Sequence, residues 1–390
     1  MTSIELNQFI LGNTGFLFLV LILNFAFLFL VYISSSVKSP LIKDLIHIPS
    51  RDSEKKTILL GGLGMAFSNI IVMHNIYSSD IVNTSDKFSA LGYILGVFIL
   101  TIQGYLDDKF ELSIKAKLSS QVFAILTYGL FLYFAFPIES LLLYSLLSLV
   151  WGLGAINGSH IIDTVKTMSV KTSTIILLYY SLISYHFNLY HLSYISALIW
   201  IPILCYWIFS KFKKNILLGE IGPNVLAVSY LFLSTQLYLN LTSSVSHMNA
   251  LCIVLIPLSI PMGEVFFNIA KKLFSRSYKD TQNEDIFKHF LSKEKSSLST
   301  RYATQISLMY FAILSCSYFI ITFTTDEGKY IISFLTCLLL LCISYLLQAK
   351  RCLNISNNKS HFGNIPEKES AQSLIKSSLV ENFDVDSKNE

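Results

Sequence analysis

Long apolar stretches follow one another along most of this chain, separated by short polar segments. About 20 apolar residues in a helix cross the roughly 30 Å hydrocarbon core of a bilayer. Eleven stretches are of about that length, at 12–35, 57–76, 89–106, 118–137, 139–156, 169–187, 191–210, 223–242, 249–270, 303–323 and 330–348. The pattern predicts an all-α, polytopic membrane protein with about eleven transmembrane helices.

The polar pattern changes near the end of the chain. No break in composition divides the apolar part, so residues 1–350 are expected to form one transmembrane domain. Residues 351–390 are rich in Ser, Asn, Lys and Glu. Such a composition buries too little apolar surface to offset chain entropy. We therefore expect 351–390 to be a disordered tail.

Basic residues give the expected orientation. Of the 29 Lys and Arg residues, all but Lys87 and Lys329 fall in the loops of one side or in the tail. The positive-inside rule then places the N-terminus outside and the C-terminus in the cytoplasm. The net charge of +4 reflects this topology, and we see no pattern for nucleic-acid binding. The first apolar stretch has no basic residue before it, so it is expected to be a retained span and not a signal peptide.

Only 14% of the residues are charged, against about 25% in soluble domains. The mean hydropathy is +0.57. Most ionisable groups fall in the loops of the predicted cytoplasmic side, and Glu264 is the one acidic residue expected well inside a span. A transporter would tend to place such groups near the bilayer midplane. The distribution favours an active site at the membrane interface.

Two adjacent carboxylates, Asp107 and Asp108, close one of the apolar runs. Magnesium prefers hard oxygen ligands, often one or two carboxylates with substrate phosphates. A carboxylate could also serve as a general base. Taken alone, the pair is explained as well by polar capping of a helix end that faces water.

Three further loops carry candidate residues. Lys55 and Lys56 precede Gly61-Gly62, an arrangement that suits an anion or simply close helix packing. Asn157, His160 and Asp163 are spaced for one helix face, which is also typical of a polar helix end. Glu220 lies between Gly219 and Gly222, where a turn and helix start, with Pro223 near the first position, is the simpler explanation. His289 is isolated, and such residues are more often solvated than catalytic.

Together these segments resemble the polyprenyl-phosphate N-acetylhexosamine-1-phosphate transferase superfamily, glycosyltransferase family 4, over about residues 40–292. The strongest agreement is with the family's glycine, Asp-Asp, Leu-Ser, lysine and glutamine. These correspond to Gly104, Asp107-Asp108, Leu112-Ser113, Lys117 and Gln121. The branch most similar comprises the undecaprenyl-phosphate GlcNAc-1-phosphate transferases, whose proline, acid and two basic residues correspond to Pro261, Glu264, Lys271 and Lys272. That branch has eleven helices with the N-terminus outside.

The chain departs from the family at several motif positions. The family's Asn-x-x-Asn-x-x-Asp-Gly-x-Asp-Gly corresponds to Gly154, Asn157, His160 and Asp163, so His160 replaces an aspartate. Glu220 replaces an aspartate and adds one methylene, a change that Mg²⁺ tolerates poorly. His160 is no oxygen ligand, but a partly cationic imidazole could contact phosphate. Of three family histidines, only His289 is kept.

The resemblance implies transfer of an N-acetylhexosamine-1-phosphate from a UDP-sugar to undecaprenyl phosphate, with release of UMP, at the start of a cell-wall, lipopolysaccharide or other envelope glycan. It implies Mg²⁺, or alternatively Mn²⁺, on Asp107, Asp108 and Glu220, with one of the two aspartates assisting the lipid phosphate. Nucleotide-sugar contacts fall to Asn157 and Asp163. Phosphate contacts fall to Lys55 or Lys56, Lys117, His160 and His289.

The expected location is the inner membrane of a bacterium, with the active site on the cytoplasmic face and membrane lipid around the chain. Whether the chain forms a homodimer is left open. Two alternatives also stay open. One is a family member that has lost catalysis and binds the lipid carrier or a nucleotide sugar, and the more distant one is a membrane transporter.

Overall fold

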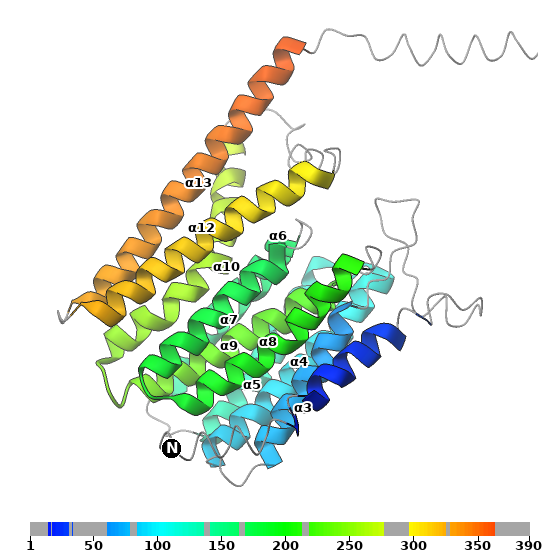
Figure 1. Ribbon diagram of the computed structural model, residues 1–390, viewed down its shortest axis with the longest axis vertical. Coiled ribbons are helices and arrows are strands. Elements are labelled where there is room, and N and C mark those ends of the chain that lie inside the picture. Colours follow the sequence, from blue (N-terminus) through cyan, green and yellow to red (C-terminus); the bar gives the residue numbers. More distant parts are fainter. Residues whose placement is uncertain are drawn as a thin grey trace, which may run out of the picture. The chain divides into compact units, whose positions relative to one another are not determined.

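The computed structural model describes residues 15–16, 18–30, 33, 61–78, 84–135, 141–163, 168–212, 218–276, 296–324 and 328–362. These residues form helices joined by short turns, and none of them lies in a strand (Figure 1). The chain divides into two compact units, Met1–Leu341 and Cys342–Glu390. The candidate residues that the structure describes all lie in the first unit.

The first unit contains Phe18–Leu30 and the labelled helices. Their bounds are α3 (Gly61–Ser78), α4 (Thr84–Phe110), α5 (Ile114–Ala135), α6 (Leu141–Asp163), α7 (Met168–His186), α8 (Tyr190–Phe212), α9 (Ile221–Leu241), α10 (His247–Arg276) and α12 (Ser296–Phe323). The helix α13 (Lys329–Phe362) begins in this unit and continues past residue 350, where the tail was expected to start. Residues 363–390 lie outside the described residues.

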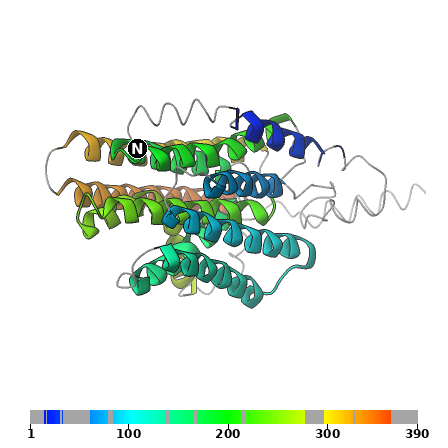
Figure 2. The same cartoon turned by 90° about the horizontal axis from the view of Figure 1, so that it is seen from below.

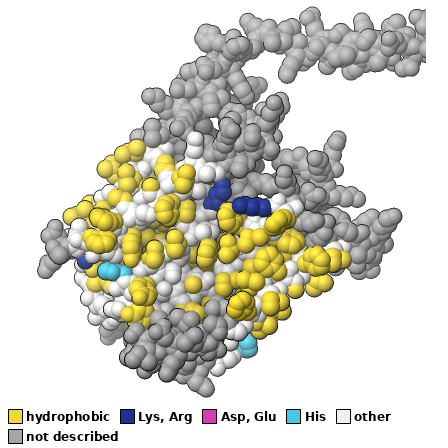
Figure 3. All heavy atoms as spheres, viewed as in Figure 1, with side chains coloured by type: hydrophobic (Ala, Val, Ile, Leu, Met, Phe, Trp, Pro, Cys, Tyr) yellow, Lys and Arg dark blue, Asp and Glu magenta, His cyan; other side chains and the backbone are white. Residues whose placement is uncertain are grey.

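Five helices of the described residues are long and apolar enough to cross a membrane. They are Thr84–Phe110, Ile114–Ala135, Tyr190–Phe212, His247–Ile269 and Thr304–Phe323. Large apolar side chains such as Phe98, Phe123 and Leu130 point outward from them, and yellow apolar side chains cover much of the face in Figure 3. A helical membrane protein is therefore confirmed. The number of eleven spans and the orientation stay predictions.

The helix α9 lies at the centre of the first unit. It packs against α3, α4, α6, α7, α8 and α10, and nearly all its side chains are buried. Figure 2 shows the neighbouring helices arranged in more than one layer. Inside a bilayer, polar groups on such a helix need protein partners. Tyr93 and Ser229 share a hydrogen bond of 2.8 Å, and the Tyr230 hydroxyl donates to Ser173 Oγ at 2.5 Å.

A close backbone contact fixes α6 against α10. A Cβ atom added at Gly158 would lie 2.0 Å from the Pro261 carbonyl oxygen, closer than any side chain allows. Proline at 257 and 261 interrupts the hydrogen-bond ladder of α10. One turn later, the Tyr310 hydroxyl of α12 donates to Glu264 Oε1 at 2.5 Å. Glu264 is thus partnered between helices, which explains how a carboxyl group is accommodated within an apolar span.

Candidate active site

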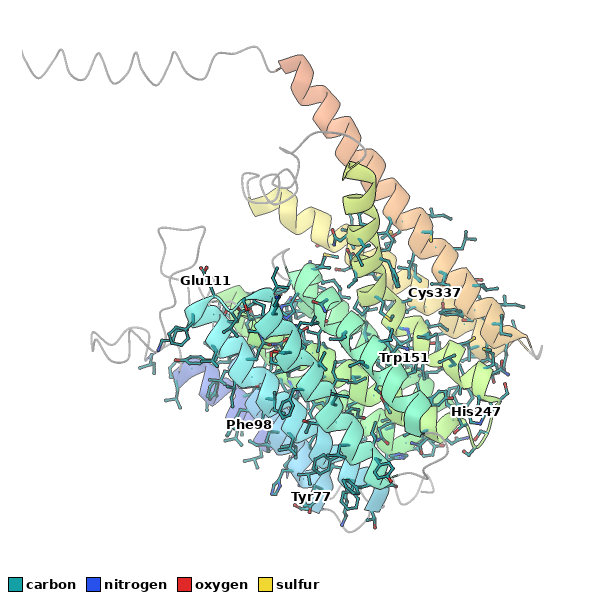
Figure 4. All side chains as sticks on the ribbon, turned by 180° about the vertical axis from the view of Figure 1, so that it is seen from behind. Tyr77, Phe98, Glu111, Trp151, His247 and Cys337 are labelled. Atoms are coloured by element: carbon teal, nitrogen blue, oxygen red, sulfur yellow. The ribbon has the colours of Figure 1, made fainter. Side chains whose placement is uncertain are left out.

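Asp107, in the last turn of α4, forms hydrogen bonds with the backbone of the turn that follows the helix. Glu111 has a positive φ of 53°, and its N–H bonds to the Asp107 carbonyl oxygen at 3.0 Å. The next N–H, that of Leu112, donates to Asp107 Oδ1 at 2.9 Å. This capping turns the chain sharply into α5, and Figure 4 shows Glu111 at this end, far from Tyr77 of α3. Asp107 therefore has a structural task as well as its predicted chemical one.

Lys117 forms an ion pair with Asp107 Oδ2. The geometry follows from the start of α5, where Ser113 Oγ accepts the Ala116 N–H at 3.3 Å and so caps the helix. The lysine then lies one turn into α5 and faces back to α4. The side chain of Asp107 is 2% exposed and that of Lys117 is 37% exposed. Lys117, which was predicted to bind phosphate, is thus already paired.

Glycines bring three helices together at the start of α9. Gly219 has a φ of 67°, a left-handed conformation that glycine adopts without strain. The Gly62 N–H of α3 donates to the Leu218 carbonyl oxygen at 3.0 Å. A Cβ added at Gly62 would lie 2.3 Å from the Gly222 nitrogen, and one at Gly104 would lie 2.8 Å from the Ile221 nitrogen. No side chain fits at either place, so backbone meets backbone here.

Asp108 lies at the N-terminus of α9. The Glu220 N–H donates to both its carboxylate oxygens, at 3.2 and 3.1 Å. The first N–H groups of a helix have no intrahelical partner and carry partial positive charge, so a carboxylate is stabilised there. Residues 108 and 220 are far apart in the sequence, and the glycine contacts at positions 62 and 104 allow them to meet.

His160 connects α6 to the same turn. Its Nδ1 lies 3.1 Å from Glu220 Oε2, and its Nε2 lies 2.9 Å from Asn224 Oδ1. The Asn224 amide in turn donates to Gln103 Oε1 at 2.9 Å and to the Leu100 carbonyl oxygen at 3.2 Å. A continuous hydrogen-bonded chain therefore crosses from α6 through α9 to α4, next to the two carboxylates of Asp108 and Glu220.

The other two predicted residues of α6, Asn157 and Asp163, differ in the contacts of their side chains. Asp163 accepts a hydrogen bond from Ser169 Oγ at the start of α7. Asn157 is exposed, and its amide donates to the Leu153 carbonyl oxygen of its own helix at 2.8 Å. His160 and Asp163 are therefore tied to neighbouring helices, whereas Asn157 keeps an accessible side chain.

The environment changes the acidity of His160 and Asp163, which follow the predicted span 139–156. Burial opposes the charged form of His160, but the hydrogen bond and charge of Glu220, aided by Asn224 and Asp163, raise the pKa of the imidazole above its ordinary value. Burial raises the pKa of the Asp163 carboxyl group to about 6, against the opposing effects of Ser169 and His160. Both shifts favour the protonated forms.

The three predicted metal ligands do not combine into one ligand set. Among the described residues, no group of three or more His, Cys, Asp and Glu side chains is arranged to hold a metal ion. The reason lies in their partners. Asp107 faces Lys117, and Glu220 faces His160. Magnesium requires near-ideal octahedral oxygen coordination, which these side chains do not offer together as they stand.

Several predicted residues lie outside the described residues, namely Lys55, Lys56 and His289. Two residues of the site were not predicted, Asn224 and Gln103. A signal for both was present in the sequence. Each is an amide in an otherwise apolar helix, one directly before Gly104 and one a helical turn after Glu220, where a buried polar group needs partners.

Comparison with known families supports the motif assignment. Residues 90–238 match the family model described as Glycosyl transferase family 4. A search of the curated proteins gave no match. The matched region contains Asp107 and also Asp108, His160, Glu220 and Asn224, which are the residues that meet at the start of α9. The family comprises glycosyl phosphotransferases that generally use a polyprenyl phosphate, a nucleotide sugar and a divalent metal ion. Residues 90–238 are therefore similar to glycosyl transferase family 4, the family that the motifs predicted.

Proposed function

We propose that this chain transfers an N-acetylhexosamine-1-phosphate from a UDP-sugar to undecaprenyl phosphate and releases UMP. The observation that carries the proposal is the meeting of three motif segments at the N-terminus of α9. Asp108 accepts the Glu220 N–H at 3.1 Å, and His160 lies 3.1 Å from Glu220. Such a convergence of charged groups is typical of phosphoryl-transfer sites, where positioning and charge neutralisation dominate catalysis.

In the proposed reaction an oxygen of the lipid phosphate attacks the β-phosphorus of the UDP-sugar. A new phosphorus–oxygen bond forms, and the bond from the β-phosphorus to the bridging oxygen breaks, so that UMP leaves with that electron pair. When the lipid phosphate is a dianion, charge balances without a proton transfer. When it is a monoanion, Asp108 takes its proton. Asp107, held by Lys117 and the Leu112 N–H, fixes the turn that carries Asp108.

Further residues are proposed to contact the two substrates. Asn157, whose side chain is exposed, and Asp163 are proposed to contact the nucleotide sugar. Lys55 or Lys56 and His289 are proposed to approach the phosphates. Mg²⁺ or Mn²⁺ is the ion that the family implies, and we assign no step to it because the described carboxylates do not form its ligand set. The proposed location is the cytoplasmic face of a bacterial inner membrane.

A second function is favoured by one observation. Asp107 is paired with the Lys117 cation, and Glu220 faces the His160 imidazole, whose pKa, against the opposing effect of burial, is raised above its ordinary value chiefly by Glu220. A family member whose acidic groups are neutralised in this way could bind a nucleotide sugar or the lipid carrier without turning it over.

A UMP-release assay separates the two functions. Purified protein is incubated with undecaprenyl phosphate, a panel of UDP-N-acetylhexosamines and Mg²⁺, and the variant Asp108→Asn is run beside it. We expect wild-type turnover with at least one donor and a rate about 10²–10³-fold lower in the variant. No turnover with any donor, together with tight UDP-sugar binding, would establish the binding function instead.

A further inference from the structure

The two ring nitrogens of His160 are both committed to partners. Nε2 faces Asn224 Oδ1 at 2.9 Å, and Nδ1 faces Glu220 Oε2 at 3.1 Å. A neutral imidazole donates from one nitrogen and accepts at the other, whereas the imidazolium ion donates from both. The protonation state of His160 can therefore be read from what its two partners are able to do.

Asn224 can only accept from His160. An amide has one oxygen that accepts and one nitrogen that donates. The Asn224 nitrogen lies 3.2 Å from the Leu100 carbonyl oxygen, which is a backbone acceptor, and 2.9 Å from Gln103 Oε1. The backbone acceptor fixes which way the amide points. The oxygen must then face His160, so Nε2 carries a proton.

The contact with Glu220 determines the proton on Nδ1 of His160. With Nε2 protonated, a neutral ring would turn the lone pair of Nδ1 toward the carboxylate oxygen, which is also an acceptor. A proton on Nδ1 removes this repulsion and gives a charge-assisted hydrogen bond. The side chains of His160 and Glu220 are 23% and 39% exposed, so both are partly accessible. With Glu220 ionised, the two contacts therefore favour a proton on each ring nitrogen of His160.

We propose that His160 is a built-in cation that occupies Glu220 in place of a divalent metal ion, and that Asn224 is the residue that positions it. The change from the family's aspartate to His160 agrees with this role in its effect on the local charge. An aspartate stands at this place in the family motif, and replacing −1 with +1 changes the local charge by two units, the charge of one Mg²⁺. The geometry fits too, because Glu220 contacts Asp108 through its backbone N–H and His160 through its carboxylate.

The proposal rests on the proposed function in assigning a nucleoside diphosphate to this site. It predicts that the diphosphate of UDP binds the wild-type chain without a divalent ion, since His160 and the N-terminus of α9 supply positive charge here. It also predicts that a divalent ion binds weakly until the histidine charge is removed, because like charges at close range repel strongly.

Metal binding is the first test. Mn²⁺ binding to the full-length protein in detergent is measured by electron paramagnetic resonance for wild type, His160→Asp, His160→Gln and Asn224→Leu. We expect His160→Asp to bind Mn²⁺ at least about tenfold more tightly than wild type, which corresponds to about 1.4 kcal/mol. His160→Gln and Asn224→Leu should show smaller gains. Equal affinity in wild type and His160→Asp would overturn the proposal.

Two features of this test guard against trivial outcomes. Loss of fold weakens metal binding and does not strengthen it, so a gain in Asn224→Leu reports positioning of His160. His186→Gln removes a histidine at the end of α7, where the ring packs edge-on against Tyr318, and should leave Mn²⁺ affinity unchanged.

UDP binding is the second test. Calorimetry in EDTA and in Mg²⁺ should give wild-type affinities that agree within about threefold, whereas His160→Asp should bind UDP at least about tenfold more weakly in EDTA than in Mg²⁺. A wild-type chain that binds UDP only with Mg²⁺ would contradict the built-in cation. Failure of wild type to bind UDP under either condition would count against the proposed function, and the Mn²⁺ measurement would still decide the role of His160.

Discussion

The two ends of α9 differ in the chemistry that surrounds them. At the N-terminal end, Asp108 and His160 reach Glu220 from α4 and α6. At the C-terminal end, Tyr238 packs edge-on against Trp151 and hydrogen-bonds to His247 Nδ1 at 3.3 Å. Between them the polar partners are hydroxyl groups, such as those of Tyr93 and Ser229. Carboxylates thus gather at one end of a helix that is buried along nearly its whole length.

This difference separates packing from chemistry. Neutral hydroxyl and amide pairs join helices in an apolar medium at modest cost, whereas charges there are expensive and usually serve a function. The carboxylates near the start of α9 are tolerated because helix N–H groups, Lys117 and His160 neutralise them. The comparison predicts that substitutions at the two ends will have unequal effects.

The largest effect is expected from a substitution near the C-terminal end of α4, with the N-terminal end of the same helix as the control. Asp108→Asn removes a carboxylate from the α9 N-terminus and should lower the rate of UMP release by about 10²–10³-fold, the usual cost of removing one preorganised electrostatic group. Asp86→Asn, in the first turn of the same helix, is the matched control and should retain the rate. Equal losses of UMP release in both variants would show that the carboxylate at the N-terminus of α9 has no particular role in the reaction.

Two glycines of α4 give the next largest effect. Gly104→Ala would place a methyl group 2.8 Å from the Ile221 nitrogen, and the resulting backbone shift should cost about 1–3 kcal/mol or more of stability. Gly96→Ala lies two turns earlier, where the nearest atom, of Val228, is 3.6 Å away. It should be neutral or stabilising in a thermal unfolding assay. A Gly104→Ala protein that melts at the wild-type temperature would contradict the close backbone contact between α4 and α9.

The Lys117–Asp107 pair should have a smaller effect on stability. Lys117→Met leaves the Asp107 carboxylate, which is 2% exposed, without its cation and should cost about 1–3 kcal/mol, discounted because Lys117 is partly exposed. Adding Asp107→Asn should recover part of this loss in a double-mutant cycle. Lys115→Met, an exposed lysine on the same turn, serves as the control. Additive effects of the two substitutions would argue against the pair.

The smallest effect concerns pH. The pKa of Asp163 is raised to about 6 from an ordinary value of 3.8, so the folded state favours the protonated carboxyl group. The stabilisation is present at about pH 4 and is lost as the pH rises through about 6. Asp163→Asn cannot titrate and should remove this slope from a plot of unfolding temperature against pH. A wild-type slope that persists in the variant would assign it to another group.

The sequence predicted the helical membrane fold and the family from periodicity and motif spacing. It also singled out Asp108, His160 and Glu220, which the fold brings together at the start of α9. It could not show their pairing, because whether a carboxylate faces a metal, a lysine or a histidine depends on helix packing. Lys117 was predicted to bind phosphate, yet the cap formed by Ser113 directs it to Asp107.

The sequence also did not identify the amide side chains of the site, which lie in apolar helices. Asn224 and Gln103 resemble ordinary core polar residues until the crossing of α4, α6 and α9 is known. The glycine at 62 was open to two interpretations, anion binding or close packing, and the one at 104 was known only as a motif residue. Their contacts with the Leu218–Gly222 turn show that packing applies at these positions.

Photoaffinity labelling with azido-UDP tests most directly whether nucleotide binds at the charged end of α9. The full-length protein is irradiated with the probe, digested and analysed by mass spectrometry, with excess UDP as competitor. The account predicts labelled peptides from 104–117, 154–163 or 218–224 that disappear with UDP. Competable labelling confined to the opposite end, around Tyr238 and His247, would contradict it.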